Sequence, residues 1–207
     1  RHTRYISVTG VQTCALPIYI SRRAAGVIGH GLLGLGLAFA SLSGRFFGAN
    51  DPTSGRVAMV LIAAVWLYNG WAKRTPLGPM VMGACRGLNV LLGASVAGEA
   101  GIASAWQPAG ACALYIAGLT WFARDDSGTS RRWQLVAAAG VVAAALGWTA
   151  WSLGSTDRLV PLAAVVGLGA FVGQRISSAL RDPGPLPVRE AVGRLLLGYI
   201  PFDAAWA

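Results

Sequence analysis

Seven apolar stretches in this sequence are long enough, or nearly so, to cross a lipid bilayer as helices. The hydrocarbon core of a bilayer is about 30 Å thick, and a helix needs about 20 apolar residues to span it. Unpaired backbone cannot lie in lipid, and only 12% of the residues are charged. The sequence therefore predicts an all-α fold, a polytopic transmembrane helical bundle of about seven helices. The stretches are 24–43, 56–72, 77–97, 105–123, 133–153, 159–174 and 188–207.

The basic residues are unevenly divided between alternate loops. One set of loops carries ten of them: Arg22, Arg23, Lys73, Arg74, Arg124, Arg131, Arg132, Arg175, Arg181 and Arg189. The other set carries three: Arg45, Arg56 and Arg158. Cytoplasmic loops of membrane proteins are enriched in Lys and Arg, so we expect a protein integral to the cytoplasmic (inner) membrane, with the first set of loops in the cytoplasm. Topology thus accounts for the net charge of +9, and we expect no nucleic-acid partner.

The first residues do not fit a membrane domain. Residues 8–18 read VTGVQTCALPI, which resembles the translation of a sequencing-library adaptor. A secretory signal peptide would need an unbroken apolar core, and Gln12 and Pro17 interrupt it. We expect residues 1–18 to be a non-native, adaptor-like segment and residues 19–207 to form the transmembrane domain.

Polar residues inside the predicted spans are costly, so each is a candidate functional residue. Arg86 and Asn89 lie three residues apart in one span and would share a helix face. Asp203 lies in the last span and could partner a cation. These three residues are candidates to line a cavity. The alternatives are a structural pair that binds neighbouring carbonyls, and an interfacial position for Asp203.

Two groups in the predicted cytoplasmic loops suit a phosphate and a metal ion. Lys73, the only lysine in the chain, and Arg74 follow Tyr68 at a helix end, where Lys and Arg could bind a phosphate oxyanion. Asp125 and Asp126 are adjacent carboxylates, and Mg²⁺ is commonly bound by one or two carboxylates together with substrate phosphates. The alternatives are a positive anchor at the membrane surface and solvated loop charges.

Three segments carry a resemblance to a known family. Leu67 to Ser95, LYNGWAKRTPLGPMVMGACRGLNVLLGAS, resembles the central helices of the UbiA superfamily of intramembrane prenyltransferases, and more closely its UbiA-like EboC branch. Ile20 to Ala25, ISRRAA, is similar to the helix start after that family's first Asp-rich loop. The tail AVGRLLLGYIPFDAAWA resembles the last helix of the branch.

This resemblance implies a nine-helix fold, of which the present chain would contain the third to ninth helices in an N-terminally truncated form. It implies transfer of a prenyl group from an isoprenyl diphosphate to a lipophilic acceptor, with Mg²⁺ as cofactor and membrane lipid as surroundings. Tyr68, Lys73 and Arg74 would bind the diphosphate, and Asp125 and Asp126 would bind the metal. No catalytic residue is assigned.

The chain departs from the family pattern in three places. The first Asp-rich motif would precede residue 19. The second should place carboxylates four residues apart, whereas residues 123–127 read ARDDS. Tyr68 and Lys73 are five residues apart, where the family spacing is four, and this changes their relative direction on a helix.

Two main functions therefore remain open. The first is a UbiA-type prenyltransferase, an enzyme that transfers alkyl or aryl groups other than methyl. The second is a non-catalytic EboC-like membrane protein that binds, or helps to export, a lipophilic metabolite. A small transporter or a purely structural bundle is a third hypothesis, which inverted repeats would favour, and the sequence shows no convincing repeat.

Overall fold

The computed structural model describes residues 21–47, 51–124, 131–154 and 159–206. The segment 1–18 lies outside this part of the chain, as do Asp125 and Asp126. In the part that is described, all regular structure is helical, which confirms the all-α fold class. The helices are α2 (Arg22–Phe46), α3 (Thr53–Gly70), η2 (Ala72–Arg74), α4 (Gly78–Ala94), η3 (Ser95–Ala97), α5 (Gly98–Phe122), α6 (Arg132–Gly154), α7 (Leu159–Arg181) and α8 (Pro185–Ala204).

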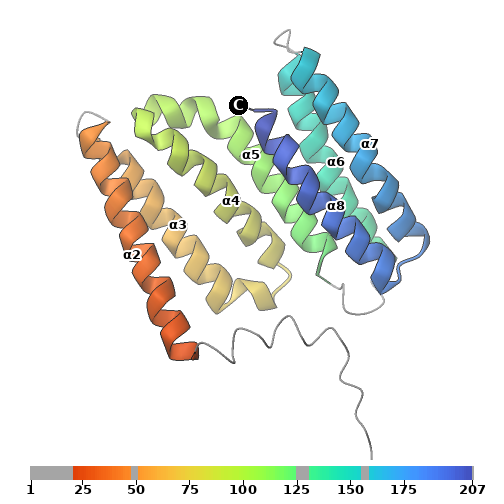
Figure 1. Ribbon diagram of the computed structural model, residues 1–207, viewed down its shortest axis with the longest axis horizontal. Helices are drawn as coiled ribbons and strands as arrows, with labels where there is room; N and C mark the ends of the chain where they lie inside the picture. The colour runs from red at the N-terminus through yellow and green to blue at the C-terminus, as the bar shows by residue number, and fades with distance from the viewer. Residues whose placement is uncertain (1–20, 48–50, 125–130, 155–158, 207) are drawn as a thin grey trace, which may run out of the picture.

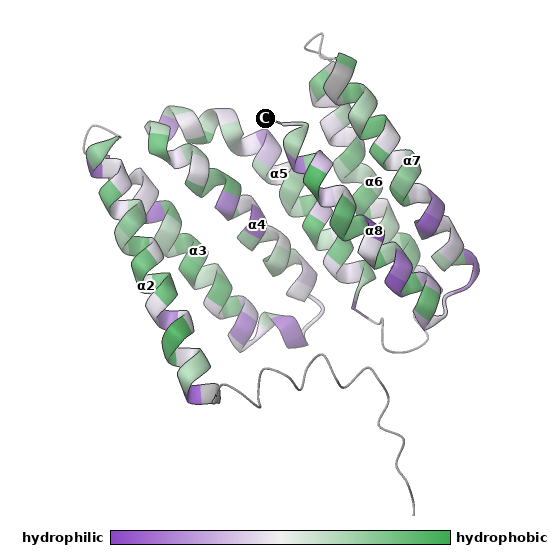
Figure 2. Ribbon diagram, in the orientation of Figure 1, coloured by the Kyte–Doolittle hydropathy of each residue, from purple (hydrophilic) through white to green (hydrophobic). Residues whose placement is uncertain are grey.

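Four helical stretches of the described chain are long and apolar enough to cross a membrane: Arg23–Phe46, Gly78–Phe122, Arg132–Leu153 and Leu162–Arg181. They indicate a membrane protein. The expected count of seven spans is not confirmed, because α3 and α8 fall outside these stretches and the second stretch contains both α4 and α5. Hydrophobic residues cover most of the helical surface, and hydrophilic residues gather toward the helix ends (Figure 2).

Two helices are longer than their hydropathy indicates. α5 starts at Gly98 rather than at residue 105, and Pro108 lies inside it. Gly98 itself has φ +69°, a backbone conformation that glycine adopts without a steric cost, and the chain reverses there between α4 and α5. α7 continues past Gln174 to Arg181. Its polar side chains Ser177 and Ser178 both donate to the Gln174 carbonyl, so they cause no break in the helix.

The helices follow one another as antiparallel neighbours (Figure 1). α2 and α3 form one edge of the bundle, α4 and α5 its middle, and α6 and α7 the other edge, while α8 packs against α7 and α5. The η2–α4 turn, the end of α5, the start of α6 and the α7–α8 turn all lie at one end of the bundle (Figure 1). The predicted orientation assigns this end to the cytoplasm.

The hydrophobic core lies on the α5–α8 side of the molecule. Its largest fully buried side chains include Tyr115 and Phe122 of α5, Leu135 of α6, and Leu195 and Phe202 of α8. In α2, by contrast, no residue of the membrane-span window is buried. The core therefore fixes α8 on α5, and these two helices carry part of the candidate site.

Close packing of α4 on α5 depends on small residues. A Cβ atom on Gly87 would lie 2.9 Å from the Ala109 carbonyl oxygen, and one on Gly83 would overlap the Ala113 carbonyl oxygen. Small residues four apart let helix backbones approach each other closely in membranes. Arg86 precedes Gly87 directly, so this contact holds its backbone beside α5.

Candidate functional site

Arg86 of α4 is the centre of a polar network that reaches α8. Its Nε atom donates to the Tyr199 hydroxyl oxygen at 2.6 Å, and its Nη2 atom lies 3.4 Å from Oδ2 of Asp203. The guanidinium carbon also lies 4.9 Å from the centre of the Tyr199 ring, within the range of a cation–π interaction. Arg86 and Asp203, predicted from sequence as cavity-lining residues, are therefore an ion pair between two helices.

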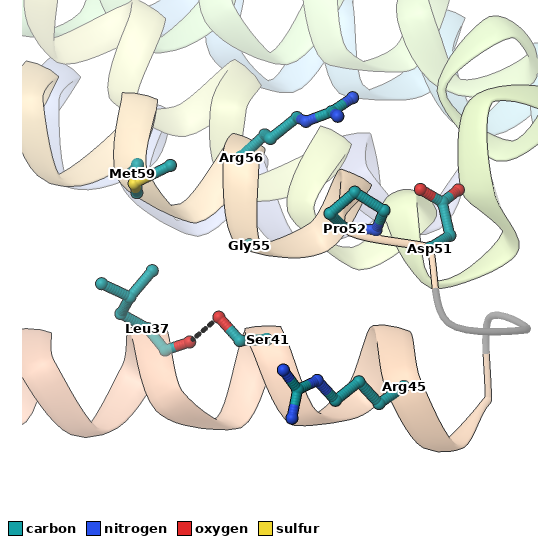
Figure 3. A pocket seen from close by; sticks show the side chains of 8 residues that line it. All are labelled: Leu37, Ser41, Arg45, Asp51, Pro52, Gly55, Arg56 and Met59. Atoms are coloured by element: carbon teal, nitrogen blue, oxygen red, sulfur yellow. Dashed lines mark hydrogen bonds between the residues drawn. The ribbon is translucent and has the colours of Figure 1, made fainter.

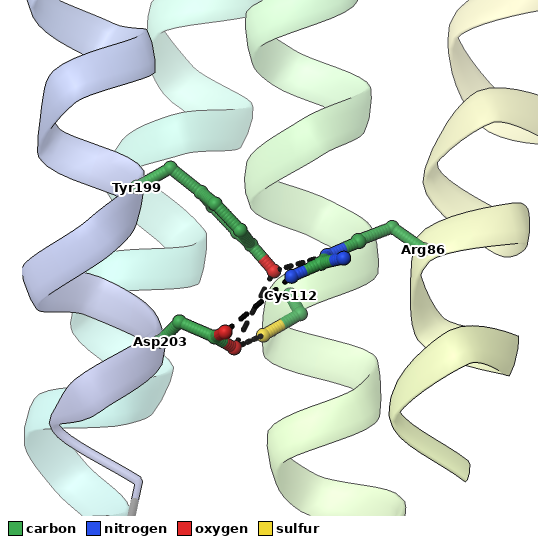
Figure 4. A network of polar contacts seen from close by, with 4 residues as sticks. All are labelled: Arg86, Cys112, Tyr199 and Asp203. Carbon is green, nitrogen blue, oxygen red and sulfur yellow. Dashed lines mark hydrogen bonds and ion pairs between the residues drawn. The ribbon is translucent and has the colours of Figure 1, made fainter. Parts of the chain in front are cut away.

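The second carboxylate oxygen of Asp203 connects the network to α5. Both the Cys112 thiol and the Tyr199 hydroxyl group lie 3.5 Å from Oδ1 of Asp203. The four side chains point toward one another from three helices (Figure 4). Cys112 is buried and forms no disulfide bond. Its thiol and the phenol thus complete a set of donors around one carboxylate.

Local sequence explains how α8 presents its two members of the network. Tyr199 and Asp203 are four residues apart and lie on one helix face. The helix is fixed against α5 by the hydroxyl group of Tyr115, which donates to the Leu195 carbonyl at 2.8 Å. The rings of Tyr115 and Phe202 stack with centroids 4.6 Å apart. The orientation of the carboxylate is therefore determined by packing on α5.

The Arg86–Asp203 ion pair is only partly buried. The side chains of Arg86 and Asp203 are 37% and 45% exposed, and their separation of 3.4 Å is long for a charge-assisted hydrogen bond. Guanidinium has five N–H donors, so several remain for another acceptor. Charged groups within a membrane face protein, water or a ligand rather than lipid. This arrangement can therefore bind a polar group of a lipophilic molecule.

Asn89, the third predicted cavity residue, is exposed and is not part of the network. Sequence reasoning missed Cys112 and Tyr199. A signal for Tyr199 exists, because it lies one helical turn before Asp203. Cys112 carries no such signal, since it lies in an apolar stretch of α5 and only the packing of α5 on α8 brings it to Asp203.

A second group of polar side chains lines a hollow of about 280 Å³ at the η2 end of the bundle. Tyr68 comes from the end of α3, Lys73 from η2 and Arg124 from the residues after α5. Thr75 stabilises the turn, because its hydroxyl group donates to the Ala72 carbonyl at 2.9 Å. The lining residues are Tyr68, Lys73, Gly78, Pro79, Thr120, Ala123 and Arg124.

This hollow brings together two of the three residues predicted to bind a diphosphate. Tyr68 and Lys73 line it although they are five residues apart, because α3 ends at Gly70 and the chain turns through η2 between them. Arg74 is exposed and does not line it. Arg124 was not predicted, and its position next to Asp125 is the signal that could have identified it. An amine, a guanidinium group and a phenol form a suitable set of donors for phosphate oxygens.

Among the described residues, no three His, Cys, Asp or Glu side chains gather as a metal site would require. The predicted metal ligands, Asp125 and Asp126, lie outside those residues. The described part of the hollow supplies cationic and neutral donors only, which suit an anion. It directly adjoins the two carboxylates in sequence, because Arg124 lines the hollow.

Comparisons of the chain with models of protein families, with curated proteins and with solved structures give no match. The interpretation of the two polar groups therefore rests on their geometry and chemistry.

Proposed function

We propose that this chain is a UbiA-type membrane protein that binds an isoprenyl diphosphate and, with Mg²⁺, transfers its prenyl group to a lipophilic acceptor. The observation that carries the proposal is the hollow lined by Tyr68, Lys73 and Arg124. It combines phosphate-binding side chains with the end of an apolar helical bundle, so it offers a charged site and an apolar site to the two parts of an isoprenyl diphosphate.

The residues of the hollow have separate roles in the proposed reaction. Lys73 and Arg124 stabilise the diphosphate, whose negative charge grows as the carbon–oxygen bond to the prenyl group breaks. The Tyr68 hydroxyl group donates to a phosphate oxygen. The acceptor forms the new bond to the prenyl carbon and loses a proton, and pyrophosphate leaves. Mg²⁺, with Asp125 and Asp126 as its proposed ligands, would supply further charge neutralisation.

Binding can be tested with farnesyl diphosphate as the probe and farnesol as the control for the apolar chain alone. We expect Lys73→Gln and Arg124→Gln each to weaken farnesyl diphosphate binding about tenfold, the loss of one charge-assisted contact. The matched control is Arg74→Gln, which removes the same charge one residue from Lys73 and outside the hollow. Equal weakening by all three substitutions would contradict the proposed site.

The single lysine gives an independent measurement of binding. Lys73 is the only side-chain amine in the chain, so acetylation followed by mass spectrometry reports on one side chain. Farnesyl diphosphate should slow acetylation of Lys73, and farnesol should not. Unchanged acetylation in the presence of saturating farnesyl diphosphate would contradict a contact between Lys73 and the diphosphate.

Catalysis is tested with labelled isoprenyl diphosphates and a lipid extract as the source of acceptor. We expect labelled product with Mg²⁺, none with a chelator, and none from Asp125→Ala or Asp126→Ala, while Arg74→Gln stays active. Protein that binds farnesyl diphosphate but transfers no label from any isoprenyl diphosphate would contradict the catalytic part of the proposal.

The Arg86–Asp203 ion pair favours a second candidate function, a non-catalytic protein that binds a lipophilic metabolite or helps to export it. The pair is partly exposed and its guanidinium group has unused donors, which suits the polar group of such a ligand. In cells that require the protein for a metabolite phenotype, Arg86→Ala should abolish the phenotype and Asp125→Ala should not. The reverse pattern would favour catalysis.

A further inference from the structure

A cavity of about 510 Å³ lies between α2 and α3, at the end of the bundle opposite Lys73. Its lining changes along the helices: charged residues lie near the helix ends, and Leu37 and Met59 lie farther along α2 and α3 (Figure 3). The cavity is therefore amphipathic. Its lining residues are Leu37, Ser41, Arg45, Asp51, Pro52, Gly55, Arg56 and Met59.

Two arginines line this cavity, and neither is ion-paired with a described residue, although the charge of Arg56 interacts with the Asp51 carboxylate over a longer distance. Neither Arg45 nor Arg56 forms a salt bridge or a side-chain hydrogen bond with any other described residue. The one carboxylate of the lining, Asp51, accepts hydrogen bonds at Oδ1 from the backbone N–H and the hydroxyl group of Thr53. Two guanidinium groups against one carboxylate leave the lining with a net positive charge.

Membrane topology does not explain these arginines. The sequence assigns three basic residues to this set of alternate loops, Arg45, Arg56 and Arg158, where the positive-inside rule predicts few. Two of the three line one cavity. Arg45 lies in the last turn of α2, where the helix dipole favours a cation, but Arg56 lies in the first turn of α3, where the dipole disfavours one. The attraction to Asp51 offsets part of this unfavourable position, but the guanidinium group of Arg56 still has no hydrogen-bond acceptor among the described residues, and an anionic ligand supplies one.

The apolar part of the cavity suits a hydrocarbon chain. Leu37 and Met59 line it, and Gly55 keeps α3 close to α2, because a Cβ atom there would lie 3.0 Å from the Ser41 Oγ atom. The Ser41 hydroxyl group donates to the Leu37 carbonyl at 2.9 Å within α2, so it offers no donor proton to a ligand. Polar recognition is thus confined to the arginine end.

We propose that this cavity binds one anionic phospholipid, with the lipid phosphate at Arg45 and Arg56 and an acyl chain along Leu37 and Met59. Arg45 runs back along α2 toward Ser41, whereas Arg56 extends away from α2 (Figure 3). Arg45 is therefore the main phosphate contact, and the flexible Arg56 side chain rotates toward the phosphate. This site is separate from the hollow at Lys73, so the proposal of a lipid site does not depend on the prenyltransferase proposal.

Native mass spectrometry of the purified chain can test this site, using equal amounts of phosphatidylglycerol and phosphatidylcholine as probes. We expect preferential retention of one phosphatidylglycerol molecule. Arg45→Gln should lower its affinity about fivefold, the effect of one arginine near a membrane surface, and Arg56→Gln should lower it less. The matched control is Arg158→Gln, which removes the third arginine that the sequence assigns to the same set of loops and should leave retention unchanged.

Three results would overturn the proposal: equal retention of the two lipids, an equal loss in all three variants, and displacement of the lipid by millimolar inorganic phosphate. The second would show a general charge effect, and the third would identify a free phosphate as the ligand. Circular dichroism and size-exclusion profiles that match the wild type show that each variant is folded. Arg45 and Arg56 are exposed residues in the last turn of α2 and the first turn of α3, so neither substitution changes the hydrophobic core.

Discussion

Two glycines near the middle of α2, Gly31 and Gly34, and two glycines of α4, Gly83 and Gly87, show opposite roles for the same residue type. A Cβ atom added to Gly31 or Gly34 of α2 would have no atom of another helix within 4 Å, whereas Gly83 and Gly87 of α4 pack directly on the α5 backbone. Small residues often mark close helix packing in membranes, but Gly31 and Gly34 make no such contact with the described residues. Glycine density alone does not identify an interface, because the contact depends on what lies opposite each residue.

The strongest test of this comparison is to add one methyl group at matched positions. Gly83→Ala places a Cβ atom against the Ala113 carbonyl oxygen and within 3.0 Å of the Ala117 Cβ atom. Neither neighbour can rotate away, so we expect a loss of about 2–3 kcal/mol in the free energy of unfolding. Gly34→Ala meets open space and should stabilise α2 by about 0.5–1 kcal/mol through helix propensity.

Unfolding in mixed detergent micelles measures both changes. A further control is Gly31→Ala, which should behave like Gly34→Ala. If Gly83→Ala were as stable as the wild type, the close contact between α4 and α5 would be disproved. If Gly34→Ala were destabilising, α2 would have a packing partner on its glycine face.

The same contrast explains how much could be predicted from the sequence. Apolar length alone predicts the helices, since each expected stretch overlaps an α-helix, and the rarity of charge in apolar stretches identifies Arg86 and Asp203 as candidate residues, although not as partners of each other. The packed glycines and Cys112 could not be predicted in the same way. Their roles depend on which helix lies opposite, and hydropathy carries no information about neighbours.

A smaller effect is expected when one hydroxyl group is removed from the core or from the α2 edge of the bundle. Both hydroxyl groups donate a hydrogen bond to a helix carbonyl. In the core, Tyr115 donates to the Leu195 carbonyl across two helices and is fully buried. At the edge, Ser41 donates to the Leu37 carbonyl within its own exposed helix. Tyr115→Phe should cost about 1 kcal/mol of unfolding free energy, and Ser41→Ala should cost close to zero.

The same micelle unfolding experiment compares these two variants. Equal losses would contradict the view that α8 is fixed on α5 by this hydrogen bond. Thr149→Val is a useful control, because Thr149 is buried but its hydroxyl group donates within its own helix, to the Ala145 carbonyl. Its loss should be smaller than that of Tyr115→Phe, since no interhelical contact is broken.

The smallest expected effect concerns acid and is confined to the edge, where Asp51 precedes α3. Hydrogen bonds from the Thr53 hydroxyl group and backbone N–H lower the pKa of Asp51 below its ordinary value of 3.8. A carboxyl group whose pKa is lowered by folding stabilises the folded state when it is ionised. That contribution is present at neutral pH and is lost as the pH falls below 3.8 and through the folded-state pKa.

Asp51→Asn removes this contribution, so the wild type should melt at a higher temperature than the variant at neutral pH, and the difference should shrink near pH 3. Thr53→Val removes the largest cause of the shift and should raise the pKa of Asp51 toward 3.8. The difference between wild type and Tyr115→Phe, which involves no titrating carboxyl group, should stay constant over the same pH range. The assignment of acid sensitivity to the start of α3 would be wrong if the melting-temperature difference between wild type and Tyr115→Phe changed with pH while the difference between wild type and Asp51→Asn did not.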